Sequence, residues 1–159
     1  MPTKRGFTLI EILIVLTIIG IIIGCALLAF EDFGATPRVL ATAEQFSNQV
    51  QLIQQQAMLT STTYGIELDP TGYQVLRFIP PSQWQRITSN NLLRKHLFPV
   101  HTLCHFESIT PKQHPSIIID TSGNITPFKL TFGLSKQPAI ITVVGLRHGK
   151  LSLERYNRP

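Results

Sequence analysis

The first third of the chain contains two helical patterns of different character. The first is a run of nineteen residues, from Ile12 to Phe30, that contains no charged residue. At 1.5 Å per residue this run forms about 28 Å of helix, close to the thickness of the hydrocarbon core of a bilayer. Buried helices of soluble proteins rarely stay apolar on every side for this long. The run therefore predicts a membrane-spanning helix over residues 7–30.

The second helical pattern is amphipathic. Apolar residues recur at spacings of three and four, while glutamine and asparagine cover the other face. This period predicts a helix over residues 38–63 that packs one face on a sheet, with a coiled-coil seam to neighbouring helices as the alternative. Between the two helices, Gly34 and Pro37 interrupt helical character, so residues 31–37 are predicted to form a kink or linker. The apolar stripe consists of Val39, Ala43, Phe46, Val50, Ile53 and Ala57.

After Tyr64 the pattern becomes that of β-strands. Strands at 64–68 and 73–78 flank a turn that contains Pro70 and Gly72. Residues 80–98 are predicted to be an irregular contact loop with a short helix near 91–97. The pattern indicates an α+β protein, in which the long helix is followed by an antiparallel β domain over residues 64–159. Further strands are predicted at 101–107, 116–120, 125–132, 139–146 and 150–156.

Charge orients the apolar run. Lys4 and Arg5 precede it, and Glu31 and Asp32 follow it. Cytoplasmic flanks of membrane helices carry the excess of Lys and Arg, so the N-terminus is predicted to be cytoplasmic and residues 38–159 to lie outside.

Glu11 is the one carboxylate at the start of the run. A charged side chain costs about 2.5–3.5 kcal/mol at the centre of a membrane helix and less near the interface, so such groups usually have a partner. A cut after Gly6 would create an amine on Phe7, four residues before Glu11 and on the same helix face. That amine could pair with Glu11 of its own chain or of a neighbour. The alternative is a glutamate that reaches the lipid headgroups.

Residues 4–11, Lys-Arg-Gly-Phe-Thr-Leu-Ile-Glu, together with the apolar run resemble the class III signal of type IV pilins and type II secretion pseudopilins. The resemblance implies that a prepilin peptidase removes the leader, residues 1–6, by cutting between Gly6 and Phe7. It further implies N-methylation of Phe7, an assembly role for Glu11 and a pilin-like fold. The protein would then be a single-pass inner-membrane protein with a periplasmic C-terminal domain. A single-span protein that is never processed is the remaining alternative.

A second resemblance lies near the C-terminus. Residues 123–132 are similar to the Gly-x-x-x-Pro-Phe-x-Leu-x-Phe stretch of the GspH/FimT family, and residues 140–153 to its closing hairpin. That family contains the H-type minor pseudopilin of type II secretion and a minor type IV pilin implicated in DNA uptake. The first function implies a subunit of the periplasmic pseudopilus. Its partners would be other major and minor pseudopilins and the secretion channel or substrate, with contacts through residues 80–98 and the outer sheet face.

The DNA-uptake function would need clustered cations with aromatic side chains. The candidate residues are Lys150, Arg155 and Arg158, with Tyr156 among them. The resemblance to the DNA-uptake pilin implies a Gly-Arg-x-Arg element on the last hairpin. Here Lys150 follows Gly149 and Ser152 replaces the second cation, which favours the secretion function. The formal charge is +5, and removal of Lys4 and Arg5 leaves +3, a weak argument for an anionic partner.

No pattern of an enzyme, a cofactor site or a metal site is present. The chain lacks the Gly-x-Ser-x-Gly, Walker, His-Glu-x-x-His and Cys-x-x-Cys motifs. Asp69 and Asp120 adjoin turns that explain them, and Glu67 and Glu154 are interpreted as isolated charges on strands. Cys25 would lie in lipid and Cys104 in water, so an intrachain disulfide is not expected.

Histidine and cysteine near residue 100 invite a zinc-site interpretation. If 101–107 is a strand, alternation places His101 and His105 on the outer face and Cys104 toward the core. His96 is a more distant candidate. The sequence therefore predicts surface histidines and a buried thiol, and no metal centre.

Overall fold

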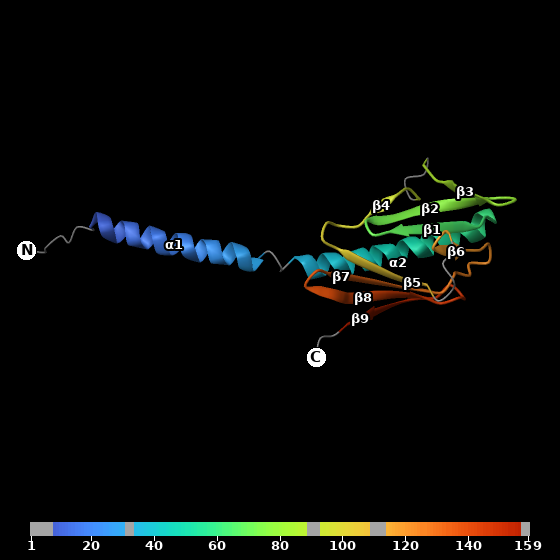
Figure 1. Ribbon diagram of the computed structural model, residues 1–159. Helices are drawn as coiled ribbons and strands as arrows, with labels where there is room; N and C mark the ends of the chain where they lie inside the picture. The colour runs from blue at the N-terminus through green and yellow to red at the C-terminus, as the bar shows by residue number, and fades with distance from the viewer. Residues whose placement is uncertain (1–7, 31–33, 89–92, 109–113, 157–159) are drawn as a thin grey trace, which may run out of the picture. The chain divides into compact units, whose positions relative to one another are not determined.

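The computed structural model describes residues 8–30, 34–88, 93–108 and 114–156. It divides into two compact units, residues 1–35 and 36–159 (Figure 1). The first unit contains helix α1 (Leu9–Phe30), and helix α2 (Ala35–Thr60) begins at the boundary and belongs to the second. The second unit also contains two antiparallel sheets, so the predicted α+β fold is confirmed.

Helix α1 is apolar on every side except at Glu11. Each side chain from Leu9 to Cys25 is exposed. Among the described residues, this helix alone is long and apolar enough to cross a bilayer. Such a surface suits lipid as its solvent.

Helix α2 begins and ends three residues earlier than predicted. Pro37 lies in its first turn, where the missing N–H would have had no partner in the helix, so proline is tolerated there. At the other end, Ser61 adopts a left-handed φ of 48° and the N–H of Thr62 donates to the carbonyl of Ala57 at 3.2 Å. This is a Schellman motif, which stops the helix at Thr60.

The strands form two sheets that consist of antiparallel pairs. The first has the order β3-β2-β1-β6, with β4 also paired to β2, and the second has the order β5-β7-β8-β9. The strands of the first sheet are β1 (Tyr64–Asp69), β2 (Gly72–Ile79), β3 (Gln83–Arg86), β4 (His96–Leu97) and β6 (Ile117–Ile119). Those of the second are β5 (Leu103–Ser108), β7 (Phe128–Leu134), β8 (Gln137–Gly145) and β9 (Leu151–Arg155).

The prediction for residues 80–98 was wrong in its local structure. The stretch contains the short strands β3 and β4, both paired with β2. The described part of the predicted short helix, residues 93–97, contains no helix and ends in strand. Residues 91 and 92 lie outside the described residues. Both strands owe their conformation to hydrogen bonds with β2, a non-local cause that hydrophobic periodicity does not reveal.

The core lies between α2 and the two sheets, and Phe46 is at its centre. The Phe46 ring meets Tyr73 of the first sheet at 5.1 Å, and Phe128 and Phe132 of the second at 6.1 and 6.2 Å between centroids. Figure 1 shows α2 running between the sheets. The predicted apolar stripe of α2 is buried along its whole length, so it packs on the sheets and is unavailable as a coiled-coil seam.

Gln54 is a buried polar residue on α2 that holds two turns. Its Nε2 donates to the carbonyl of Gly123 at 2.9 Å and to that of Gly149 at 3.0 Å. These glycines have φ of +81° and +86°, where a side chain would be strained. The side chain of Gln54 therefore joins the turn after β6 and the turn before β9 to the second half of α2.

Replacing Gln54 by leucine is expected to destabilise residues 36–159 by about 1–3 kcal/mol, since two carbonyls lose their donor. Urea unfolding of this unit measures the change. Gln55→Leu, at the adjacent exposed position, is the control and should change stability little. Equal stability of the two variants would show that the turns do not depend on Gln54.

Candidate assembly site

The N-terminus of α1 is capped in a way that fixes the backbone at Glu11. The N–H of Glu11 donates to the carbonyl of Thr8 at 3.1 Å and lies 3.4 Å from the Thr8 hydroxyl oxygen. Thr8 is thus the N-cap, and the Thr-x-x-Glu spacing is that of a capping box. Sequence reasoning missed this role of Thr8, although the spacing was a visible signal.

Glu11 carries the only charge within the span of α1. Its position in the first helical turn suits a carboxylate, because the positive end of the helix dipole lies there. Gly6 and Phe7 lie outside the described residues, so cleavage between them and the pairing of the Phe7 amine with Glu11 remain predictions.

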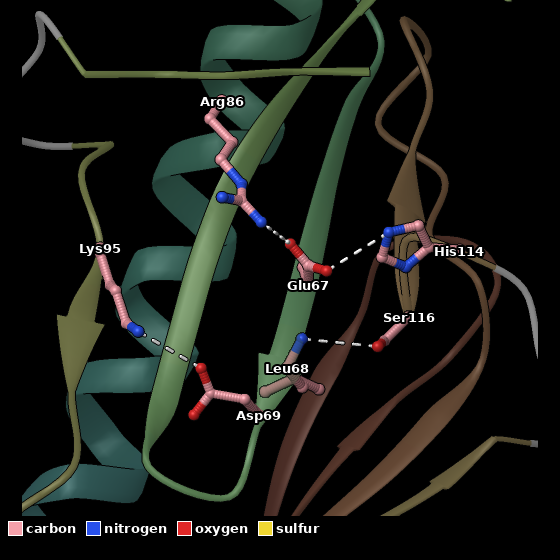
Figure 2. Close-up of polar contacts among 7 residues, drawn as sticks. All are labelled: Glu67, Leu68, Asp69, Arg86, Lys95, His114 and Ser116. Carbon is pink, nitrogen blue, oxygen red and sulfur yellow. Dashed lines mark hydrogen bonds and ion pairs between the residues drawn. The ribbon is translucent and has the colours of Figure 1, made fainter. Parts of the chain in front are cut away.

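A group of ion pairs surrounds β1 on the second unit (Figure 2). Glu67 contacts Arg86 of β3 through Oε2 at 3.7 Å and His114, before β6, through Oε1 at 3.3 Å. The interpretation of Glu67 as an isolated charge was therefore wrong. Its partners lie far along the chain, and only the pairing of β1 with its neighbours brings them close.

Asp69, at the end of β1, holds the β1–β2 turn. Its Oδ1 accepts hydrogen bonds from the N–H of Thr71, at 2.7 Å, and from the Thr71 hydroxyl. Lys95 lies 3.5 Å from its other oxygen. The Thr71 hydroxyl is the main cause that lowers the pKa of Asp69, against a smaller effect of burial, and Lys95 adds to the lowering. The assignment of Asp69 to a turn is confirmed.

Between α2 and β3 lies a polar hollow of about 310 Å³. Arg77 and Arg86 are both among its lining residues, but the register places the Arg77 side chain on the sheet face of Tyr64 and the Arg86 side chain on the opposite face, with Glu67. An acidic group in the hollow would therefore pair with the Arg77 guanidinium. Part of the predicted contact region, residues 80–98, borders this hollow. The lining residues are Gln56, Tyr64, Arg77, Gln85, Arg86, Ile87, Thr88 and Leu93.

The residues considered for a metal do not converge. Cys104 and Phe106 pack against the core while His105 is exposed on the other face, so the predicted alternation is confirmed over β5. His101 precedes the strand, and the His96 ring stacks on Tyr73. No group of three His, Cys, Asp or Glu side chains that could hold a metal occurs among the described residues. Burial, with the charge of Asp69, raises the pKa of Cys104 to about 12.

The cations considered for DNA are spread apart. Lys150 precedes β9 and Arg155 ends it, which separates them by about 17 Å of extended chain. Arg155 also lies 3.8 Å from Glu44 of α2. Arg158 lies outside the described residues. Lys150 and Arg155 thus form no phosphate-binding cluster.

Comparison with known proteins gives one match to the N-terminal signal and others to most of the chain. Residues 1–27 match the family model described as the prokaryotic N-terminal methylation motif. Type II secretion system protein H of Pseudomonas aeruginosa is 30% identical over 145 residues, which cover 82% of this chain and 83% of the relative. The chain belongs to the type II secretion system protein H family.

Other members and solved structures agree with this assignment. Protein H of Klebsiella pneumoniae is 27% identical over 150 residues, covering 82% of this chain and 86% of the relative. The minor pseudopilin EpsH of Vibrio cholerae has the same fold, with a TM-score of 0.67 at 17% identity over 78% of this chain and 98% of EpsH. Escherichia coli GspH gives a TM-score of 0.65 at 19% identity over 79% and 93% of the two chains. The H-type pseudopilin interpretation is confirmed over the FimT interpretation.

For this H-family chain, Thr71→Val should raise the pKa of Asp69 toward its ordinary value, since the main hydrogen bond that lowers it is lost. The lowered pKa of Asp69 contributes stability at pH values above the pKa that this carboxyl has in the unfolded chain. That contribution disappears as the pH falls through the pKa of Asp69 in the folded protein. The variant should therefore lose less stability on acidification. NMR titration of the Asp69 carboxyl carbon measures the shift. Thr121→Val, on another exposed turn, is the control; an unchanged Asp69 titration in Thr71→Val would contradict the assignment.

Cys104 is expected to react slowly with a disulfide reagent at mildly alkaline pH in folded residues 36–159 and rapidly in urea. A pKa near 12 leaves little thiolate, and the thiol faces the core. The control combines Cys104→Ser with His105→Cys, which moves the thiol to the exposed face and should restore fast reaction. Rapid reaction of folded Cys104 would show that β5 does not face the core as described.

Proposed function

We propose that this chain is a structural subunit of the periplasmic pseudopilus of a type II secretion system and catalyses no reaction. The observation that carries the proposal is the apolar helix α1, with Glu11 as its one charge, joined to a domain of the protein H family. The similarity to protein H identifies the family, and helix α1 with Glu11 provides a means of assembly.

Maturation begins at the leader. A prepilin peptidase cuts between Gly6 and Phe7 and Phe7 becomes N-methylated; the match of residues 1–27 to the methylation motif supports this step. Helix α1 then spans the inner membrane with its N-terminus cytoplasmic, and residues 36–159 lie in the periplasm. The order of charges, with Lys4 and Arg5 before the span, supports this orientation.

Assembly rests on the charge of Glu11. A carboxylate without a partner in an apolar helix is costly, and cleavage supplies an amine one helical turn away. Pairing with the amine of a neighbouring subunit relieves the cost in both chains and sets their register along the fibre. The Thr8 cap supports this role, because it holds the Glu11 backbone in the first turn of α1.

The periplasmic domain provides the contacts with other subunits. The hollow beside Arg77 fits an acidic group of an adjacent pseudopilin or of the secretion channel. On the other face of the first sheet, the ion pairs of Glu67 hold Arg86 of β3 and the segment before β6 in place.

Glu11→Gln should leave cleavage intact and lower incorporation into the pseudopilus by about tenfold to a hundredfold, the equivalent of one charge-assisted hydrogen bond. Copurification with other pseudopilins and secretion of a reporter cargo measure the effect. The control is Thr17→Val in the same helix, where the hydroxyl bonds only to the carbonyl of Leu13 in the described structure.

Normal incorporation of the Glu11→Gln variant would show that assembly does not require the charge of Glu11. Loss of incorporation in both variants would point to a general effect on α1 and would equally contradict a specific role of Glu11.

A further inference from the structure

The segment between β4 and β5 exposes three large aliphatic side chains in a short stretch. Leu97 is 70% exposed, Val100 84% and Leu103 45%. Leu97 and Leu103 flank, and Val100 lies within, a turn in which the N–H of Thr102 donates to the carbonyl of Pro99 at 3.1 Å. His101 within this turn has a φ of +69°, a strained conformation for a residue other than glycine. We name residues 97–103 the apolar tip.

The apolar tip lies at the end of the domain where α2 begins. The N–H of Phe98 donates to the carbonyl of Thr71 in the β1–β2 turn at 2.8 Å. The Phe98 ring packs on Tyr73 and Phe132, and both of these meet Phe46 in the first half of α2. The turns that Gln54 holds lie at the other end. Figure 1 shows the chain between β4 and β5 passing the beginning of α2.

Two observations indicate what covers this tip. First, only four residues separate α1 from α2, so at most about 18 Å of chain joins Phe30 to Ala35. A tether of this length keeps the domain near the surface of a bilayer that α1 spans. Second, two cations, Arg94 and Lys95, come just before the tip, and Lys95 lies 3.5 Å from Asp69.

We propose that the apolar tip inserts into the headgroup region of an anionic bilayer, so that the domain rests on the membrane surface before it enters the fibre. Exposed aliphatic side chains flanked by basic residues are the composition that binds such a surface. This inference rests on the proposed function, which places the domain beside the membrane in which α1 is anchored.

The test uses the full chain in nanodiscs of phosphatidylethanolamine and phosphatidylglycerol doped with a gadolinium-chelating lipid. Paramagnetic broadening of backbone amide signals reports their proximity to the lipid headgroups. Amide signals of residues 97–103, apart from Pro99, which has no N–H, should be broadened several-fold more than those of residues 58–61 at the other end of α2. Val100→Asp should remove most of this excess broadening at the tip. Nanodiscs of phosphatidylcholine alone, which carry no net charge, should reduce it.

The matched control is Leu59→Asp, because Leu59 is 82% exposed, almost as much as Val100, but lies at the far end of α2. It should leave the broadening of the tip unchanged. The proposal would be overturned if the amides at both ends of α2 were broadened equally. It would also be overturned if Leu59→Asp, but not Val100→Asp, removed the excess broadening at the tip. Crosslinking of position 100 to another pseudopilin without lipid broadening would overturn it in favour of a protein partner.

Failure of the proposed function gives a different result. A chain that is inactive in secretion still enters the nanodisc through α1, and its tip can be measured. A chain that does not enter the nanodisc contradicts membrane anchoring itself and overturns both proposals.

Discussion

Contact of one side chain, Phe46, with aromatic rings from both sheets is the interaction on which the domain depends. The two sheets do not share strands, and α2 supplies the apolar surface that covers both. Around this centre the helix also fixes the ends of the domain. Gln54 holds the turns at one end, and Phe98, through Tyr73 and Phe132, holds the apolar tip at the other. Contacts with α2 therefore fix the positions of the surfaces proposed for function.

The apolar surfaces of the two helices require different surroundings. Helix α2 hides one apolar face against protein, whereas α1 is apolar all round and needs lipid or the helices of neighbouring subunits. In such an environment the proposed pairing of Glu11 would distinguish one partner from another, since aliphatic surfaces alone give little register. Membership of the protein H family gives this arrangement its place in type II secretion, where a fibre is built from membrane-anchored subunits.

The sequence predicted what depends on local pattern. The unbroken apolar run, the stripe through Phe46 and the alternation of Cys104 and Phe106 each reflect the repeat of one element. It did not predict β3 and β4, which exist through pairing with β2, or the partners of Glu67, which are close only after the sheet forms. The end of α2 was missed because Ser61, and not glycine, adopts the left-handed conformation.

The central claim is that cleavage creates the partner of Glu11. Intact-mass measurement of the chain, isolated from the inner membrane of a host that contains prepilin peptidase, tests it most directly. The expected result is a mature chain that begins at Phe7 and carries one additional methyl group. A chain that still begins at Met1, in a host whose other pseudopilins are processed, would contradict it.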